Sequence, residues 1–275
     1  MPWISYAQNA EDVRLRRAFA GQTGGFYIDV GANHPLGGSV TKHFYDEGWS
    51  GINVEPLPQQ FALIAAQRSR DINLNVGCSA APGQLTLFAA RKASSMSTFT
   101  AAEAEQHRRN GVEFDEINCP VRTLADICAE HARGKVIDFL SVDVEGHERD
   151  VLAGGDFSLF RPRIVVVEAT RPNSTEPTHE CWEHLLLERS YLFAVFDGLN
   201  RYYVRREDEQ LVPVIALGPN VFDDYVPYVY HRKIELLEAR LAASNLIGRV
   251  STPIVTVSRA TRRLRAWVSG RRQGR

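Results

Sequence analysis

The sequence has few cysteines, almost no net charge and no long apolar run, and each of these features argues against a class of protein. Its four cysteines in 275 residues form no C-x-x-C pair, so we expect neither a disulfide framework nor a structural zinc site, and we expect a reducing compartment. The net charge of −1 disfavours nucleic-acid binding. No run of about 18 apolar residues is present, and no apolar core follows Ser5 as it would in a signal peptide. We therefore expect a cytoplasmic protein.

Charge is nevertheless unevenly distributed along the chain. Residues 229–275 hold 11 Lys or Arg against 2 Asp or Glu, a balance of +9, which leaves −10 for residues 1–228. The contrast predicts two parts, a main domain (1–228) and a C-terminal helix with a basic tail (229–275). The tail arginines around Trp267 could contact the anionic inner membrane surface or an acidic partner such as a glycosyltransferase. The alternative is a solvated end without a partner.

The order of apolar runs predicts the fold class. Strand-like runs lie at 26–30, 51–55, 72–76, 138–142, 164–168, 193–196 and 201–204. Helical patterns lie at 5–19, 39–48, 58–70, 124–132, 148–152 and 230–243. Buried strands alternating with helices predict an α/β fold whose sheet is mostly parallel, with helices on both faces. The last two runs are joined at Asp197–Asn200 and predict an antiparallel hairpin at one edge.

One segment interrupts this alternation. Residues 84–88 and 116–122 resemble additional short strands, and they flank a serine-rich loop and a polar helix at 101–109. The insertion at about 84–122 is either a lid that shapes an acceptor site or a surface excursion without a role.

Candidate site residues follow the strands, at the edge where open α/β sheets bind ligands. Gly31 follows the first strand, and Glu55 follows the second, 24 residues later. A glycine lets the backbone approach a ligand, and an acidic residue at this distance can accept hydrogen bonds from ribose hydroxyls. The G-x-G-x-x-G fingerprint is missing, which argues against NAD.

Acidic residues also follow two later strands. Asp143, Glu145 and His147 come after the run at 138–142, and Glu168 ends the run at 164–168. Carboxylates gathered at one edge of a sheet are costly unless a cation, a proton-transfer role or polar ligand groups compensate for their burial.

The chain resembles the FkbM family of S-adenosylmethionine-dependent methyltransferases. The resemblance rests on Phe26-Tyr-Ile-Asp-Val-Gly-Ala-Asn33, on the runs 48–56 and 121–126, and on Asp138-Phe-Leu-Ser-Val-Asp-Val-Glu-Gly146. It implies a class I, Rossmann-like methyltransferase fold with a seven-stranded sheet. It also implies O-methylation of a sugar, polysaccharide or secondary-metabolite acceptor. His34-Pro35 departs from the family pattern, in which Asp or Asn and then Gly are common.

The resemblance also implies roles for individual residues. Asp29, Gly31, Ala32 and Asn33 would hold the amino-acid part of the cofactor, Glu55 its ribose, and Gly77, Cys78 and Ser79 its adenine, while Gln8 would reach the same pocket.

Methyl transfer to an alcohol needs help in removing the hydroxyl proton. We expect Asp143 and Glu168 beside the acceptor oxygen, either as general base or as ligands of Mg²⁺ or another divalent cation such as Ca²⁺. His147 is an alternative base, or else an exposed histidine. Glu145 either binds a cofactor amine, next to Asp143, or caps the following helix.

A second class of function remains open from the sequence. The domain could bind a glycan or a partner enzyme without catalysis, through a degenerate cofactor site. Binding of cofactor without turnover would favour this alternative. The motifs specify neither the acceptor nor the oligomeric state.

Overall fold

The computed structural model describes residues 2–248, and the side chains of residues 2–242. The chain divides after Tyr230 into two units, and of the second only the continuation of helix α9 (Tyr228–Gly248) is described. The predicted basic tail beyond this helix, with its expected membrane or protein contacts, lies outside the described residues.

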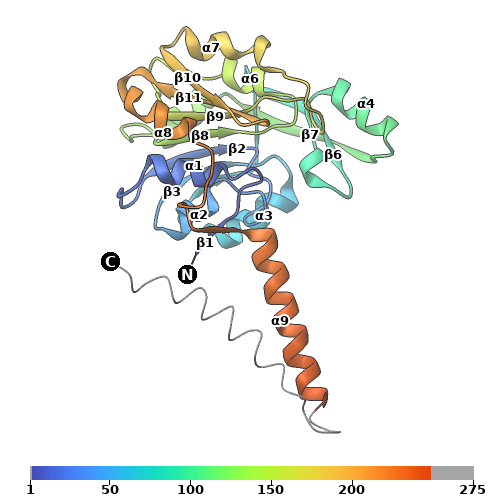
Figure 1. Ribbon diagram of the computed structural model, residues 1–275. Coiled ribbons are helices and arrows are strands. Elements are labelled where there is room, and N and C mark those ends of the chain that lie inside the picture. The colour runs from blue at the N-terminus through green and yellow to red at the C-terminus, as the bar shows by residue number, and fades with distance from the viewer. Residues whose placement is uncertain (1, 249–275) are drawn as a thin grey trace. The chain divides into compact units, whose positions relative to one another are not determined.

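A seven-stranded sheet forms the centre of the first unit (Figure 1). Across the sheet the strands are β4 (Ile72–Leu74), β3 (Ser50–Val54), β2 (Phe26–Val30), β8 (Phe139–Val142), β9 (Ile164–Glu168), β11 (Asn200–Arg205) and β10 (Tyr191–Phe196). The first five are mutually parallel, and β11 pairs antiparallel with both β9 and β10. The prediction of a mostly parallel sheet is confirmed.

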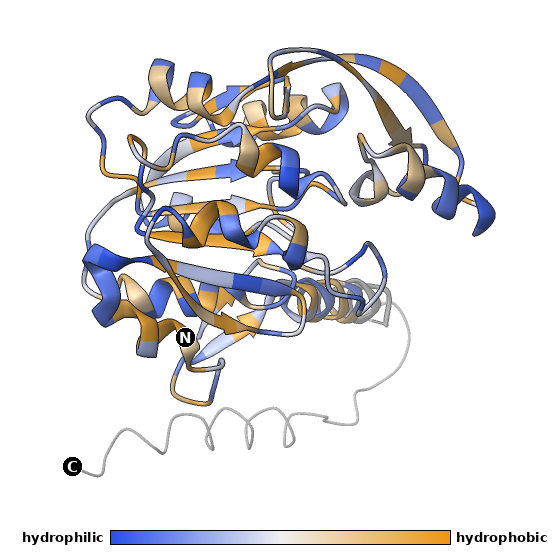
Figure 2. Cartoon of the chain, turned by 90° about the horizontal axis from the view of Figure 1, so that it is seen from above, coloured by the Kyte–Doolittle hydropathy of each residue, from blue (hydrophilic) through white to orange (hydrophobic). Residues whose placement is uncertain are grey.

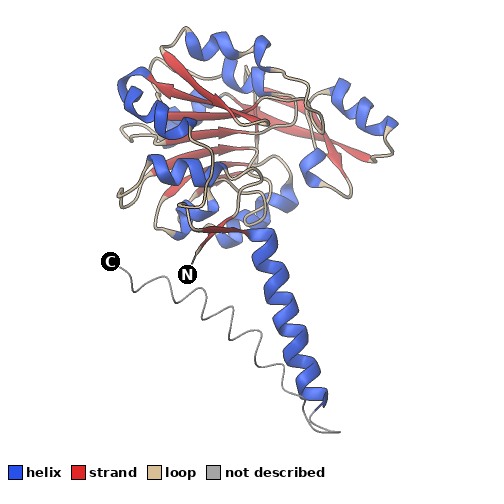
Figure 3. Cartoon of the chain, in the orientation of Figure 1, coloured by secondary structure: helices blue, strands red, loops and turns tan. Residues whose placement is uncertain are grey.

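Helices cover both faces of this sheet, as Figure 3 shows. On one face α5 (Leu124–His131), α6 (Glu148–Ala153) and α7 (Glu183–Leu187) contribute to the larger apolar cluster. On the other face α1 (Glu11–Ala18), α2 (Lys42–Asp46) and α8 (Val212–Ala216) contribute to a second cluster. The remaining helices of the described chain are α3 (Pro58–Gln67), α4 (Ala101–Arg109) and α9, with short 3₁₀ turns η1 (Ser94–Met96), η2 (His179–Cys181) and η3 (Arg206–Leu211).

The alternation of side chains along the strands explains the two clusters. In β2, Phe26, Ile28 and Val30 point into the larger cluster, whereas Tyr27 packs in the other. Successive strand residues face opposite sides, so a strand buried on both faces is apolar throughout. Figure 2 shows the central strands mostly in the hydrophobic colour. The polar residues that do occur, such as Asp29, therefore need hydrogen-bond partners.

The predicted insertion folds into a small sheet of its own. Strands β5 (Gly77–Cys78), β7 (Phe114–Arg122) and β6 (Gly83–Ala90) pair in that order, and in Figure 1 the β6–β7 hairpin and α4 extend from one end of the main sheet. Phe88 forms a two-way backbone bridge with Thr98, at 2.9 and 3.1 Å. This bridge holds the end of the serine-rich segment 94–98 against β6.

The predicted helix at 5–19 is wrong for its first part. Trp3–Ser5 form strand β1, which pairs in parallel with β12 (Tyr225–Pro227), and α1 begins only at Glu11. The Asp12 carboxylate accepts hydrogen bonds from Ser5 Oγ (2.6 Å) and Tyr6 N (2.7 Å). These bonds fold the preceding backbone onto the first turn of α1, and Ala10 at φ 59° starts the turn.

The helices and the cysteines bear on membrane spanning and on disulfide bonding, respectively. Among residues 2–248, no helix is both long enough and apolar enough to cross a bilayer. All four cysteines are free thiols, with Cys181 exposed and the other three buried.

Candidate active site

A cavity opens at the carboxyl ends of β2, β3 and β8. The chain leaves β2 toward β3 on one side of the sheet, and later returns to form β8 on the other side, so strand order reverses here. This is the position where open α/β sheets bind ligands. The cavity contains about 920 Å³ of empty space, its open mouth included. Gly31, Glu55 and Asp143 all line it.

Gly31 allows the ends of β2 and β8 to come together. Its φ is 88°, and a Cβ atom at this position would lie 1.8 Å from the carbonyl oxygen of Asp143. Every other residue would therefore be strained in backbone conformation and would also collide with β8. Gly31 N donates to Val54 O at 3.0 Å, which fixes the same turn against β3.

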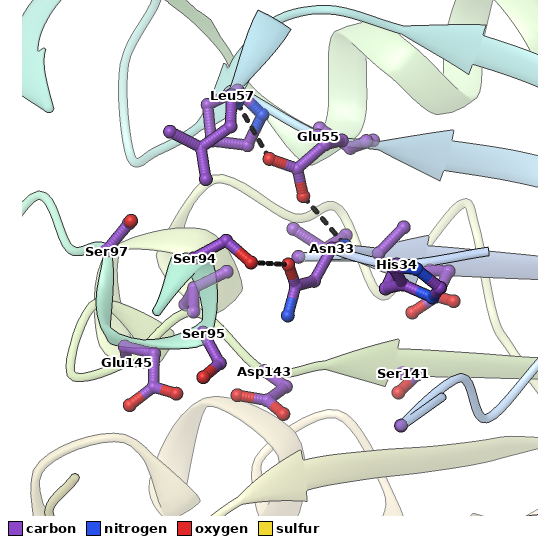
Figure 4. A pocket seen from close by; sticks show the side chains of 18 of the residues that line it. Asn33, His34, Glu55, Leu57, Ser94, Ser95, Ser97, Ser141, Asp143 and Glu145 are labelled. Carbon is purple, nitrogen blue, oxygen red and sulfur yellow. Dashed lines mark hydrogen bonds between the residues drawn. The ribbon is translucent and has the colours of Figure 1, made fainter. Parts of the chain in front are cut away.

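Glu55 closes a second turn across the cavity (Figure 4). Its Oε2 accepts a hydrogen bond from Asn33 N and its Oε1 from Leu57 N, both at 2.7 Å. The residue is 4% exposed, and this burial raises the pKa of Glu55 to about 7, although both hydrogen bonds favour the ionised form. Each oxygen uses one acceptor position for the backbone and keeps another for a ligand hydroxyl.

The loop between β2 and α2 is held by its own His34 and by Arg68 from outside it. His34 Nδ1 accepts the N–H groups of Leu36 (3.1 Å) and Gly37 (3.2 Å). The buried Arg68 donates to Pro35 O at 2.9 Å and to Ser39 Oγ at 2.8 Å. His34 and Pro35 therefore form a turn that is held by hydrogen bonds, and helix α2 starts only at Lys42. The turn at Gly31 does not lead into a helix N-terminus that could bind a phosphate.

Asp29 is the penultimate residue of β2 and contacts this loop. Its Oδ2 accepts a hydrogen bond from Thr41 Oγ1 at 2.8 Å. Burial raises the pKa of Asp29 to about 6, while Thr41 and the nearby Arg68 act in the opposite direction. Asp29 thereby anchors the far end of the loop and also lines the cavity.

Three carboxyl groups lie close together beyond β8 and β9. Asp143 is exposed at the cavity wall, but the loss of solvation among the surrounding protein atoms raises its pKa, and a hydrogen bond from the Glu168 carboxyl partly offsets this. The pKa of Glu168 is raised to about 11, first by burial and then by repulsion from Asp143 and Glu145. Because repulsion from neighbouring carboxyl groups adds to burial at Glu168, Glu168 favours the protonated form more strongly than Asp143 does.

Glu145 occupies a turn of high backbone energy. Its φ is 54° and that of Gly146 is 95°, and a left-handed conformation is unusual for a glutamate. Glu148 Oε1 accepts the N–H groups of Val144 (3.2 Å) and Gly146 (3.0 Å) and so holds the turn in place. Burial, Asp143 and Glu148 raise the pKa of Glu145 to about 9. The expected capping of α6 by the Glu145 side chain is not observed. The side chain that accepts backbone N–H groups of this turn is that of Glu148.

The insertion covers this site. Ser94 Oγ donates to Asn33 Oδ1 at 2.8 Å, Thr98 Oγ1 to Glu145 O at 2.8 Å, and Thr100 Oγ1 to Gly146 O at 3.0 Å. Phe99 packs so closely on Gly77 that a Cβ there would lie 2.5 Å from its ring. Of the two interpretations of the insertion, these contacts favour a wall of the site.

Most residues expected to hold the cofactor line the cavity. They are Gln8, Asp29, Gly31, Ala32, Asn33, Glu55, Gly77, Cys78, Asp143 and Glu145. The cavity is also lined by residues that sequence reasoning did not select, among them His34, Ser94, Ser95 and Phe99. These residues reach the cavity through contacts between segments that are distant in the sequence. The only sequence feature that pointed to any of them is the serine-rich composition of residues 94–97.

Three selected residues lie elsewhere. Glu168 lines a second cavity next to the first, whereas Ser79 and His147 are absent from the described linings of both. His147 is buried rather than exposed, with Nε2 3.1 Å from Ser79 Oγ and Nδ1 3.4 Å from Asp150 Oδ2. Burial lowers the pKa of His147. These contacts show that His147 has a structural role, joining the start of α6 to the residue after β5.

The described residues contain no group of three or more His, Cys, Asp or Glu side chains arranged to hold a metal ion. The Asp143 and Glu168 carboxyl groups share a hydrogen bond, and the pKa of each is raised.

A family model described as the Methyltransferase FkbM domain matches residues 29–193, a range that includes both the cavity-lining strand ends and the insertion. No curated protein matches the chain.

Proposed function

The chain belongs to the FkbM methyltransferase family, and from this premise we propose that it binds S-adenosylmethionine in the first cavity and transfers the methyl group to a hydroxyl oxygen of a small or sugar-like acceptor.

The charge of the cavity lining carries this proposal. Asp29, Glu55, Asp143 and Glu145 line the cavity, and no Lys or Arg occurs among the described residues that line it. S-adenosylmethionine carries a sulfonium and an ammonium group against one carboxylate, so it is a net cation. A pyrophosphate such as that of NAD would meet carboxylates without a compensating cation. The lining therefore fits the sulfonium cofactor and opposes a dinucleotide.

The donor and acceptor groups also fit the parts of this cofactor. Glu55 has free acceptor positions for two ribose hydroxyls, as described above. Asp29, Gly31 and Asn33 would surround the amino-acid part, and Glu145 would face its ammonium group. The apolar side chains of Cys78, Leu87 and Phe99 line the same cavity and would contact adenine.

The bound cofactor would supply an electrophilic methyl group, and the residues of the chain would position the acceptor and remove its proton. Asp143 is the proposed proton acceptor because burial and neighbouring carboxyl groups raise the pKa of Glu168 and favour its protonated form. Glu168 would orient the acceptor oxygen by hydrogen bonding. The separate alternative, a divalent ion held by the same two residues, predicts that chelation abolishes turnover.

Calorimetric titration tests the cofactor part. We expect S-adenosylmethionine and S-adenosylhomocysteine to bind, and NAD⁺ at the same concentration not to bind. Methyl transfer is then measured as S-adenosylhomocysteine release on hydroxylated acceptors, with Mg²⁺ and with EDTA. Absence of cofactor binding would refute the proposal. Cofactor binding without turnover on any acceptor would favour the non-catalytic binding module.

A further inference from the structure

We propose that the second cavity is the acceptor pocket of this enzyme and that it selects an uncharged, hydroxyl-rich molecule, such as a neutral glycoside, over a sugar acid or sugar phosphate. This inference rests on the proposed function, because it assigns the second substrate of the same reaction.

The position of the second cavity fits an acceptor. Gln8, Ser95 and Glu145 line both cavities, so the two spaces meet at these side chains. Glu168 at the end of β9 lies on the acceptor side of that boundary. A methyl group presented from the first cavity would reach the second one beside Glu145 and the Asp143–Glu168 pair.

One buried hydroxyl oxygen in this cavity is unsatisfied. Thr170 Oγ1 has no hydrogen-bond partner within the described chain, although Thr170 is only 2% exposed. Glu168, which is 7% exposed, lines the same cavity with its carboxyl group bonded to Asp143. Leaving a buried polar atom unpaired costs about 1–3 kcal/mol. Hydroxyl groups both donate and accept hydrogen bonds, so a ligand hydroxyl could satisfy Thr170 Oγ1.

The remaining described lining is mostly polar and contains no Lys or Arg. It comprises Gln8, Ser95, Met96, Glu145, Asn173, Ser174, Thr175 and Leu199 in addition to Glu168 and Thr170. Hydroxyl and amide groups of this kind recognise sugar hydroxyls, whereas a carboxylate or phosphate on the ligand would find no Lys or Arg in the described lining to pair with. Because burying an anion without a paired cation is costly, the lining discriminates against anionic acceptors.

The nearest arginine along the chain does not change this conclusion. Arg171 follows Thr170 directly, but its guanidinium pairs with Glu103 at 3.1 Å and with Glu176 at 3.3 Å. Arg171 is absent from the described lining of the second cavity. Its charge is compensated outside the pocket.

The outer wall of the pocket is preformed by residues 171–176. Arg171 N donates to Glu176 O at 2.8 Å, and Ser174 Oγ accepts Glu176 N at 3.0 Å. These bonds set the positions of the polar side chains of 173–175 before any ligand binds.

The first experiment compares acceptors and two threonine variants. Neutral methyl glycosides, glucuronic acid and glucose 6-phosphate are offered with S-adenosylmethionine, and the kinetics of methyl transfer are measured for the wild type, Thr170→Val and Thr178→Val. Thr178 Oγ1 is also buried and unpaired, but Thr178 is not part of the described pocket lining. It is therefore a matched control.

We expect at least tenfold higher kcat/KM for neutral glycosides than for the two anions. Thr170→Val should raise the KM for the acceptor about tenfold, the effect of one lost hydrogen bond, with unchanged cofactor affinity by calorimetry. Thr178→Val should match the wild type. Preference for an anion, equal effects of the two variants, or cofactor binding without turnover of any neutral glycoside would overturn the inference.

A second variant tests the electrostatic argument directly. Thr175 is exposed at the pocket wall, and Thr175→Arg should shift the kcat/KM ratio toward glucuronic acid by about tenfold while S-adenosylhomocysteine binds as before. An unchanged ratio would contradict the role of charge. Absence of cofactor binding to the wild type would instead refute the proposed function. Failure of the acceptor inference and failure of the proposed function are therefore distinguishable.

Discussion

The Glu55 carboxylate accepts the backbone N–H of Asn33 at 2.7 Å, and this bond joins the turn after β3 to the turn after β2. Asn33 lies at φ 46°, in the left-handed region that asparagine tolerates better than most residues. The second oxygen of Glu55 holds Leu57 N. One side chain therefore both shapes the cavity and offers acceptors to a ligand.

We predict that Glu55→Ala weakens binding of S-adenosylmethionine by roughly ten- to a hundredfold, since hydrogen bonds to a charged group contribute about 1.5–3 kcal/mol. Glu55→Gln should have a smaller effect, because one oxygen acceptor remains. Calorimetric titration of both variants measures the difference. Glu47→Ala, which changes an exposed glutamate, is the control. Affinity of Glu55→Ala within twofold of the wild type would show that Glu55 does not hold the ribose.

Gly31→Ala should unfold at a markedly lower temperature than the wild type and should lose cofactor binding. The added Cβ would collide with Asp143 O, which belongs to the backbone and cannot rotate away. Gly21→Ala is a matched control, since Gly21 has a similar φ of 83° but no atom within 4 Å of the added Cβ. It should lose only about 1 kcal/mol from backbone strain. Equal melting temperatures of the two variants would disprove the packing argument.

The sequence predicts those parts of the site that depend on local pattern. The apolar run at 26–30 coincides with β2, and the residues directly after the strands, Gly31 and Glu55, line the cavity. Parallel strands place such residues at one edge whatever the details of packing. The same argument brought Asp143 to this edge.

Contacts between distant segments were not predictable in the same way. Ser94 meets Asn33 across 61 residues, and His147 turns toward Ser79 rather than toward solvent or substrate. Neither contact has a periodic or compositional signal. The N-terminal helix was predicted too long because the side-chain bonds of Asp12 override an amphipathic pattern.

Binding of S-adenosylmethionine should release protons and should become tighter as the pH rises from 6 to 8. The pKa values of Glu55 and Glu145 are raised to about 7 and about 9, so both groups hold protons for part or all of this range. A cation placed beside them lowers their pKa values and expels protons. Calorimetry in phosphate and in Tris, which differ in ionisation enthalpy, counts the protons.

S-adenosylhomocysteine is the control for that experiment, because it lacks the sulfonium charge. It should release fewer protons, and its affinity should depend less on pH. Equal proton release for the two ligands, or proton uptake with either, would contradict the assignment of the acidic lining to the sulfonium. Glu145→Gln should reduce the difference between them.

Glu148 should make the folded state less stable as the pH rises. Burial raises the pKa of Glu148 from 4.5 to about 7, so the folded state holds this proton more tightly than the unfolded state. The resulting stabilisation is complete below about pH 4.5 and is lost as the pH rises through 7. Its magnitude is on the order of 3 kcal/mol, which corresponds to several degrees in melting temperature.

Glu148→Gln isolates this contribution. Its amide oxygen can still accept the N–H groups of Val144 and Gly146 that Oε1 accepts in the wild type, but the side chain stays neutral at every pH. Melting temperatures measured from pH 5 to 8 should therefore fall more steeply for the wild type than for Glu148→Gln. Other buried acids, such as Glu11, act equally in both proteins and cancel in the comparison. Glu188→Gln, at an exposed position, should follow the wild type; parallel curves for all three proteins would show that Glu148 ionises without penalty.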